Sequence, residues 1–214
     1  MPHDAGNLVT VLAAVPFTNG VVLGTAPAGS PAGGRESGPA ALVSNSVLKT
    51  PWGLVAGSFA SGARTVLARC GGPLTDFSVD AVAAALACLQ RAGGSGAAAT
   101  WLLSYEPGPA GPESPGKWLG APVAMYRYAG GGLAAARWGM AAVRGPAEAE
   151  VVREGERRLH WALDRGADLD TRLSVLLDFF GWMAERIPSV TGDVEVGLHE
   201  AGHRFAVDRM RMRP

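Results

Sequence analysis

The sequence predicts an α+β domain in which antiparallel β-sheets pack face to face and helix pairs cover the outside. Two observations predict this class. Strand-like segments occur in groups, and helical segments occur in pairs between those groups. A doubly wound parallel sheet would instead place one helix after each strand. The length of 214 residues suits one domain, and the hydrophobic share of 48% is enough for its core.

The first group contains four strands. These strands are short and are expected at residues 8–15, 20–25, 41–48 and 53–57. A turn at 16–19 separates the first two strands and begins with Pro16. Residues 26–38 are rich in glycine, proline, alanine and serine, so this segment is expected to be a loop.

The first helix pair follows these strands. A short helix is expected over residues 63–68, and the Gly-Gly-Pro sequence at 71–73 ends it. Ser78 or Asp80 can cap a second helix that runs to Arg91. Its alanine-rich face suits close packing against a sheet.

A second group of strands comes next. These strands are expected at residues 97–104, 123–128 and 133–138, with the last two forming a hairpin. Pro122 stands just before a strand, where its missing N–H removes no interior ladder bond. The loop at 106–120 is long enough to be functional, although its composition names no ligand.

The second helix pair and a closing hairpin complete the chain. Pro146 suits the first position of a helix over residues 146–164. The helix over 171–187 has a broad apolar face, and Pro188 ends it. Residues 194–198 alternate between apolar and other side chains, and 204–208 are their expected hairpin partner.

Charge and cysteine content restrict the partners and the compartment. The chain has 19 basic and 19 acidic residues with no basic stripe, which excludes nucleic acid as an expected partner. Neither a signal peptide nor an apolar run of membrane-spanning length is apparent, so a cytoplasmic protein without membrane association is expected. Cys70 and Cys88 are interpreted as buried thiols in a reducing compartment. Charged residues make up only 18%, which suits a subunit covered in an oligomer but also follows from alanine richness.

Three parts of the sequence carry a family resemblance. The first is Thr-Val-Leu-Ala from Thr10, followed by Asn-Gly-Val-Val-Leu-Gly-Thr at residues 19–25. The second is Val-Leu-Lys at 47–49 with Trp-Gly-Leu-Val-Ala-Gly-Ser at 52–58. The third is the predicted hairpin over 190–207. In this order and spacing they resemble proteasome β-type subunits, which are N-terminal nucleophile (Ntn) hydrolases.

The resemblance implies a fold and a chemistry. The fold is one four-layer αββα sandwich over residues 1–214, with 1–9 as a short N-terminal extension. Thr10 would be the nucleophile, and its own freed α-amine, with a pKa of about 7.7–8.0, would be the base. Lys49 would lower the nucleophile's pKa, and the Gly57 backbone would receive the oxyanion. Lys49 and Lys117 are the only lysines, yet Lys49 is equally interpreted as an ordinary strand-end lysine.

The sequence departs from the family pattern at several positions. Ala26 stands where an acidic residue should hold the lysine, and Ser189 and Asp193 only approximate the expected partners. Val9 precedes Thr10, whereas the self-cleavage that frees the threonine normally follows glycine. We therefore predict a catalytically silent subunit without a cofactor, acting as a structural or binding element in a homo- or hetero-oligomer of like subunits. The alternative is a threonine amidohydrolase or peptidase that acts on peptide or amide substrates after processing at Thr10.

A second alternative is a zinc hydrolase. His199-Glu200-Ala-Gly-His203 matches the pattern in which two histidines one helical turn apart bind zinc beside a glutamate base. That geometry requires a helix. The segments on both sides alternate with a period of two, and Ala-Gly suits a turn, so a hairpin is the prediction here. If a helix formed instead, His199 and His203 would bind the metal and Glu200 would be the base.

Overall fold

The computed structural model describes most of the predicted strands and the second helix pair. The described residues are 11–26, 43–50, 52–60, 65, 83–84, 86–87, 100–106, 122–129, 132–136, 139–141, 146–162, 166–187, 190, 193–202 and 204–212. They form two five-stranded sheets and two long helices.

The first sheet has the strand order β10-β9-β2-β1-β8 and is antiparallel throughout. Its strands are β1 (Val11–Phe17), β2 (Gly20–Ala26), β8 (Gly139–Ala141), β9 (Asp193–Glu200) and β10 (Arg204–Arg211). Every residue of β1 and β2 is buried, because helices cover one face of this sheet and the second sheet covers the other.

The second sheet has the order β3-β4-β5-β6-β7 and is also antiparallel. Its strands are β3 (Val43–Lys49), β4 (Gly53–Ala60), β5 (Thr100–Tyr105), β6 (Ala124–Ala129) and β7 (Gly132–Ala136). An aromatic stack on its outer face places the Trp101 ring 5.9 Å from Phe59 and 5.1 Å from Tyr128.

The two sheets pack on each other through alternating side chains. On β1, Leu12 and Ala14 contact the second sheet, whereas Val11, Ala13 and Val15 belong to the core beneath the helices. This period of two is the geometry of a strand buried on both faces. The inter-sheet core continues through Val21 and Leu23 of β2 and Val47, Leu54, Leu102 and Met125 of the second sheet.

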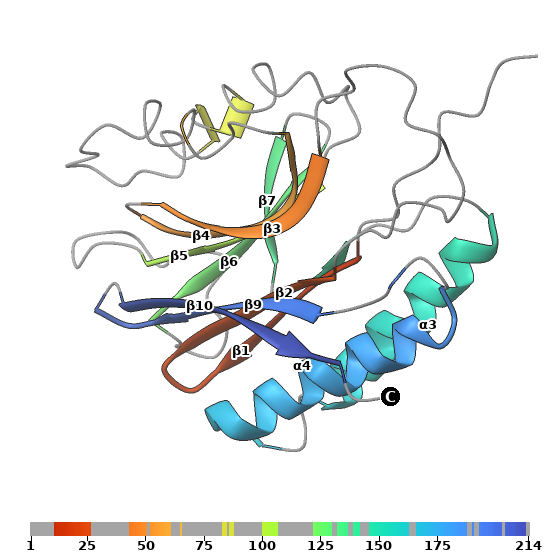
Figure 1. The fold of residues 1–214 in the computed structure, drawn as a ribbon. Coiled ribbons are helices and arrows are strands. Elements are labelled where there is room, and N and C mark those ends of the chain that lie inside the picture. The colour runs from red at the N-terminus through yellow and green to blue at the C-terminus, as the bar shows by residue number, and fades with distance from the viewer. Residues whose placement is uncertain are drawn as a thin grey trace, which may run out of the picture.

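Helices α3 (Pro146–Ala162) and α4 (Leu169–Ala184) lie side by side on the outer face of the first sheet (Figure 1). Asp168 is the N-cap of α4, and its carboxylate accepts hydrogen bonds from the Thr171 N–H at 2.9 Å and the Thr171 hydroxyl at 2.7 Å. Phe180 and Leu176 of α4 pack over Gly24 of β2, where a Cβ would lie 2.6 Å from the Phe180 ring. Glycine at this position therefore lets the helix approach the sheet closely.

The described residues confirm the α+β class with two antiparallel sheets and one outer helix pair. The other predicted pair, at 63–68 and from Ser78 or Asp80 to Arg91, lies mostly outside the described residues. The fourth layer of the sandwich therefore stays a prediction. None of the described helices has the length and apolar character needed to cross a membrane.

Two elements differ from the sequence-based expectation. β1 extends through Pro16 to Phe17, although a turn is predicted from Pro16. Proline is tolerated because β1 is paired with β8 only from Leu12 to Ala14, so the missing N–H breaks no described ladder bond on that side. The strand predicted over 133–138 corresponds to β7, and residues 137–138 lie outside the described residues. The chain then contributes β8 to the first sheet, a strand that the sequence analysis does not predict.

Candidate functional sites between the sheets

Of the three predicted catalytic residues, the structure describes Lys49 and Gly57. Thr10 lies outside the described residues, so the nearest marker of its place is Val11, the first residue of β1. Lys49 ends β3, is exposed, and donates from Nζ to the Phe205 carbonyl oxygen at 3.3 Å. Phe205 therefore marks the position of the Lys49 ammonium, and Val11 marks the position next to Thr10.

Strand register shows that Phe205 and Val11 lie at opposite ends of the first sheet. Phe205 pairs with His199, and His199 pairs with Val21 of β2, which in turn pairs with Pro16 near the end of β1. Val11 pairs with Ala26 at the opposite end of β2. At ~3.3 Å per residue, Val21 and Ala26 are separated by roughly 16 Å along the strand. Because β10 and β1 also lie on opposite sides of β2, the backbone at Phe205 is remote from the start of β1.

Gly57 lies inside the second sheet, between Ser46 of β3 and Trp101 of β5. A Cβ at this position would lie 2.1 Å from Cδ1 of Trp101. The packing of the aromatic stack is therefore sufficient reason for glycine here. An oxyanion role for the Gly57 backbone stays a prediction.

A polar cluster that the sequence analysis did not single out lies toward the start of β1. The Glu195 carboxylate accepts hydrogen bonds from the Ser46 hydroxyl and the Val47 N–H, both at 2.9 Å, and lies 3.6 Å from Nε of Arg209. Glu195 pairs with Thr25, whose hydroxyl is fully buried and has no hydrogen-bond partner among the described residues. Glu195 thus satisfies an N–H on the outer edge of β3 and ties the two sheets together.

Ala26, where the family resemblance expects an acid, belongs to the core beneath the helices. Its side chain is 1% exposed. At this end of the sandwich the carboxylate belongs to Glu195 of β9, not to the last residue of β2. Its partners are Ser46, Val47 and Arg209.

A second polar cluster lies at the opposite end of the inter-sheet space. His199 and Ser104 are both fully buried, and Nδ1 of His199 lies 2.8 Å from the Ser104 hydroxyl oxygen. That oxygen also accepts from the Leu54 N–H at 3.1 Å. Glu106 places one carboxylate oxygen 3.7 Å from Nε2 of His199 and accepts the Gly202 N–H with the other at 2.9 Å.

The order Ser104, His199, Glu106 has the residue types of a hydrolytic triad, but burial assigns it another role. A nucleophilic serine must reach a substrate carbonyl. The Ser104 side chain has no exposed surface and accepts a backbone N–H. The hydrogen bond between His199 and Ser104 is thus a polar link from β9 to β5 across the sandwich. Its sequence signal is the alternation of β9, which places Glu195, Gly197 and His199 on the face opposite Val194 and Val196.

The residues of the zincin pattern form a strand and a turn. β9 runs through His199 and Glu200, Ala201 and Gly202 turn with a φ of +82° at Gly202, and β10 begins at Arg204. His203 lies outside the described residues. The hairpin prediction is confirmed, and the helix that would align His199 with His203 is not formed. Among the described residues, no three His, Cys, Asp or Glu side chains are grouped as metal ligands.

Two antiparallel sheets packed face to face, with a helix pair outside, define a fold like that of the Ntn hydrolases. Among solved structures, the chain is similar to the Anbu (Gly-1) mutant from Hyphomicrobium sp. strain MC1, with a TM-score of 0.58 and 11% sequence identity. The match covers 94% of this chain and 87% of that one. Anbu is a proteasome-like protein of the Ntn hydrolase superfamily, and at this identity the likeness establishes the fold alone. No family model and no curated protein matches the sequence.

Proposed function

We propose that this chain is a divergent proteasome-like subunit of β type that is catalytically silent and serves as a structural or binding element in an oligomer of like subunits. The observation that carries the proposal is the place of Lys49. Its ammonium is bound to the Phe205 carbonyl on β10. Val11, the first residue of β1, lies at the opposite end of the paired strands. The proteasome-like part of the proposal is supported by the fold it shares with Anbu.

Chemistry explains why the place of Lys49 matters. A threonine hydroxyl is a weak nucleophile unless a base and a nearby cation lie within hydrogen-bond reach of it. Of the two lysines, Lys117 lies outside the described residues, and Lys49 would have to abandon its β10 contact and cross much of the sandwich. The polar residues described toward the start of β1 include Thr25, Ser46, Asp193, Glu195 and Arg209, and Glu195 is already held by hydrogen bonds.

Two mass measurements on the purified protein test the proposal. Denaturing mass spectrometry should give a mass that includes the residues before Thr10, so that no threonine amine is freed. Native mass spectrometry should give a multiple of the chain mass. A monomer would contradict the oligomeric role.

A chain that begins at Thr10 would contradict silence and would favour the threonine amidohydrolase or peptidase alternative. In that case hydrolysis of peptide or amide substrates should be lost in Thr10→Ala and retained in Ser174→Ala, a control on the exposed surface of α4.

A further inference from the structure

We infer that His199 is a proton-sensitive link between the two sheets, which tightens when the imidazole takes up a proton and pairs with Glu106. The link is a conformational device of the fold, and no catalytic role is assigned to it. It is independent of the proposed oligomeric function, because His199, Ser104 and Glu106 belong to one chain and meet between its own sheets.

Hydrogen bonding around Ser104 determines which nitrogen of His199 carries the proton in the neutral ring. The Ser104 oxygen accepts the Leu54 N–H at 3.1 Å, so its own proton is available to Nδ1 of His199, which lies 2.8 Å away. Nδ1 is then an acceptor, and the ring N–H is on Nε2. That side of the ring faces Glu106, whose carboxylate oxygen lies 3.7 Å from Nε2.

Uptake of a second proton changes this arrangement without breaking it. The proton enters at Nδ1, which then donates to the Ser104 oxygen, and the serine hydroxyl proton turns away. A serine oxygen has two lone pairs, so it can accept the His199 and the Leu54 N–H together. The ring is then positive and faces the Glu106 carboxylate, so an ion pair replaces the contact of a neutral ring with a carboxylate.

Burial gives this ion pair its weight. The His199 side chain has no exposed surface, and that of Glu106 is 17% exposed. Charges in such surroundings attract each other more strongly than on the surface, and an opposite charge within about 4–6 Å favours the ionised form. Removal of the ring from water opposes its ionisation. We expect the Glu106 carboxylate to offset this cost, so that His199 titrates between pH 5 and 8.

The strands packed against β9 bring one cation toward this pair. β2 and β4 contain no ionisable side chain, and Phe205 of β10 places an apolar ring 4.5 Å from the imidazole. β3 contributes Lys49, whose ammonium bonds to the Phe205 carbonyl oxygen. Lys49 is exposed, so water and salt screen its repulsion of a charged His199. Glu106 therefore dominates the electrostatics of the ring among the described residues.

The other charges of the β9–β10 hairpin lie farther away or on the other face. Glu195 and Arg209 pair with each other four residues along β9 from His199, which is roughly 13 Å. Successive side chains of a strand point to opposite faces, and directly paired residues share a face. Three charged residues are placed by this rule on the face opposite His199: Glu200, Arg204 and Asp208.

The link also holds the turn between β9 and β10. The second carboxylate oxygen of Glu106 accepts the Gly202 N–H at 2.9 Å. Ala201, in the same turn, donates its N–H to the Asn19 carbonyl oxygen between β1 and β2 at 2.9 Å. A proton on His199 therefore acts where two turns and the end of β5 meet, and it fastens Glu106 between the ring and the β9–β10 turn.

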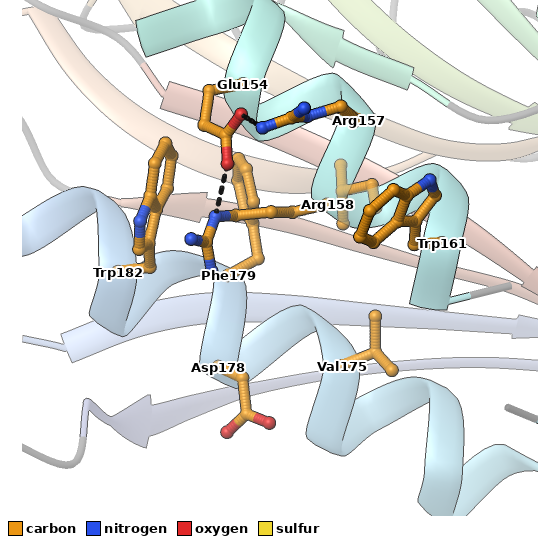
Figure 2. Close-up of a pocket in the computed structure, with 9 residues that line it drawn as sticks. Glu154, Arg157, Arg158, Trp161, Val175, Asp178, Phe179 and Trp182 are labelled. Atoms are coloured by element: carbon orange, nitrogen blue, oxygen red, sulfur yellow. Dashed lines mark hydrogen bonds and ion pairs between the residues drawn. The ribbon is translucent and has the colours of Figure 1, made fainter.

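The ion pairs in the groove between α3 and α4 show by contrast why burial and residue type matter (Figure 2). Glu154 binds Arg157 and Arg158 there, as the dashed lines mark. The two arginine side chains are 61% and 52% exposed, so water and salt screen both pairs. Arginine also keeps its charge from pH 5 to 8. These pairs therefore give no proton response in that range.

A pH titration by NMR tests the inference. Histidine ring signals are followed from pH 8 to 5, and the His199 signal is the one that is lost in His199→Asn. At pH 8 the nitrogen shifts should place the proton on Nε2. Glu106→Gln should lower the titration midpoint of His199 by at least ~1 pH unit, because an opposite charge at this distance shifts it by about 1–3 units. Glu200→Gln, on the other face, is the matched control and should leave the midpoint unchanged.

A double-mutant cycle measures the link itself. His199→Asn keeps a partner for Ser104 but cannot take up a proton, and Glu106→Gln keeps an acceptor for the Gly202 N–H without the charge. Urea denaturation of the wild type, both single variants and the double variant gives a coupling factor, the ratio of their unfolding equilibrium constants. This factor should be at least ~5-fold larger at pH 5.5 than at pH 8. Other titrating groups are common to all four proteins and cancel.

Three results would each overturn the link. A wild-type His199 signal that keeps its neutral position down to pH 5 would show that burial holds the ring uncharged, and this test needs no variant to fold. A midpoint that Glu106→Gln leaves unmoved would remove the ion pair. A coupling factor that is equal at both pH values would show that protonation tightens nothing. Each of these results would leave the proposed oligomeric function standing, and a monomeric wild-type protein would contradict that function and leave the link in place.

Discussion

At the scale of single residues, packing against Trp101 explains why glycine stands at position 57 without any catalytic role. It lies against Trp101, whose ring is stacked between Phe59 and Tyr128. Gly57→Ala would place a Cβ 2.1 Å from Cδ1 of Trp101, so the stack or the strand must shift. We expect a loss of ~1–3 kcal/mol in the free energy of unfolding, the usual effect of overpacking a core, measured by urea denaturation.

The control for this change is Gly132→Ala. Gly132 is exposed at the start of β7, and the nearest atom to a Cβ there would be the Ala129 carbonyl oxygen at 3.9 Å. Its substitution should alter stability by less than ~0.5 kcal/mol. Equal effects of the two substitutions would mean that the contact between Gly57 and Trp101 does not require glycine.

His199 shows what sequence could and could not predict about a single side chain. The alternation of residues 194–198 predicts strand and turn around it, and that prediction is confirmed. Its partners are Ser104 of β5 and Glu106 just after that strand, both nearly a hundred positions earlier in the chain. No local pattern indicates which distant strand a histidine will face, because the sheet-to-sheet packing decides it.

At the scale of elements, the start of α4 gives a pH dependence. The hydrogen bond from the Thr171 N–H, followed by that from its hydroxyl, lowers the pKa of Asp168 below its ordinary value of 3.8. When the pKa of a carboxyl is lower in the folded state than in the unfolded state, its charged form stabilises the fold. This contribution is complete above the unfolded-state pKa and is lost as the pH falls through the folded-state pKa. The cap should therefore be fully effective at pH 5 to 7 and weaken below pH ~4.

Asp168→Asn isolates this effect, because asparagine can cap the helix but does not titrate. Urea midpoints of the wild type and the variant should differ by a constant amount between pH 5 and 7. That difference should move in the variant's favour as the pH is lowered toward 3. A difference that is independent of pH over the whole range would contradict the role assigned to the charged form of Asp168.

Element types were predictable because they follow from local patterns, whereas several boundaries follow from pairing. The helix predicted over 171–187 begins at Leu169, since Asp168 forms the cap. β9 and β10 extend to Glu200 and Arg211 because the two strands pair along their whole length. β8 is three residues long and was not predicted as a separate strand, since its assignment depends on its partner β1.

At the scale of the whole molecule, the order of elements predicts the two-sheet architecture, while the site depends on register. Lys49 is the last residue of β3, a strand that local sequence identifies correctly. Whether it faces Thr10 depends on how β3 is staggered against β2, β9 and β10. The hydrogen bond from the Val47 N–H to the Glu195 carboxylate and that from Lys49 Nζ to the Phe205 carbonyl set that stagger, and both join residues about 150 positions apart.

The proposed assembly also predicts how the stability of the whole molecule responds to concentration. Association of folded chains stabilises the native state by mass action, so the thermal midpoint of an oligomer rises with protein concentration. For a dimer of chains of this length we expect a rise on the order of 2 °C for each tenfold increase, measured by differential scanning fluorimetry. A wild-type midpoint that is constant over a hundredfold range of concentration would show that folding and association are not coupled, and would contradict the proposed oligomeric role.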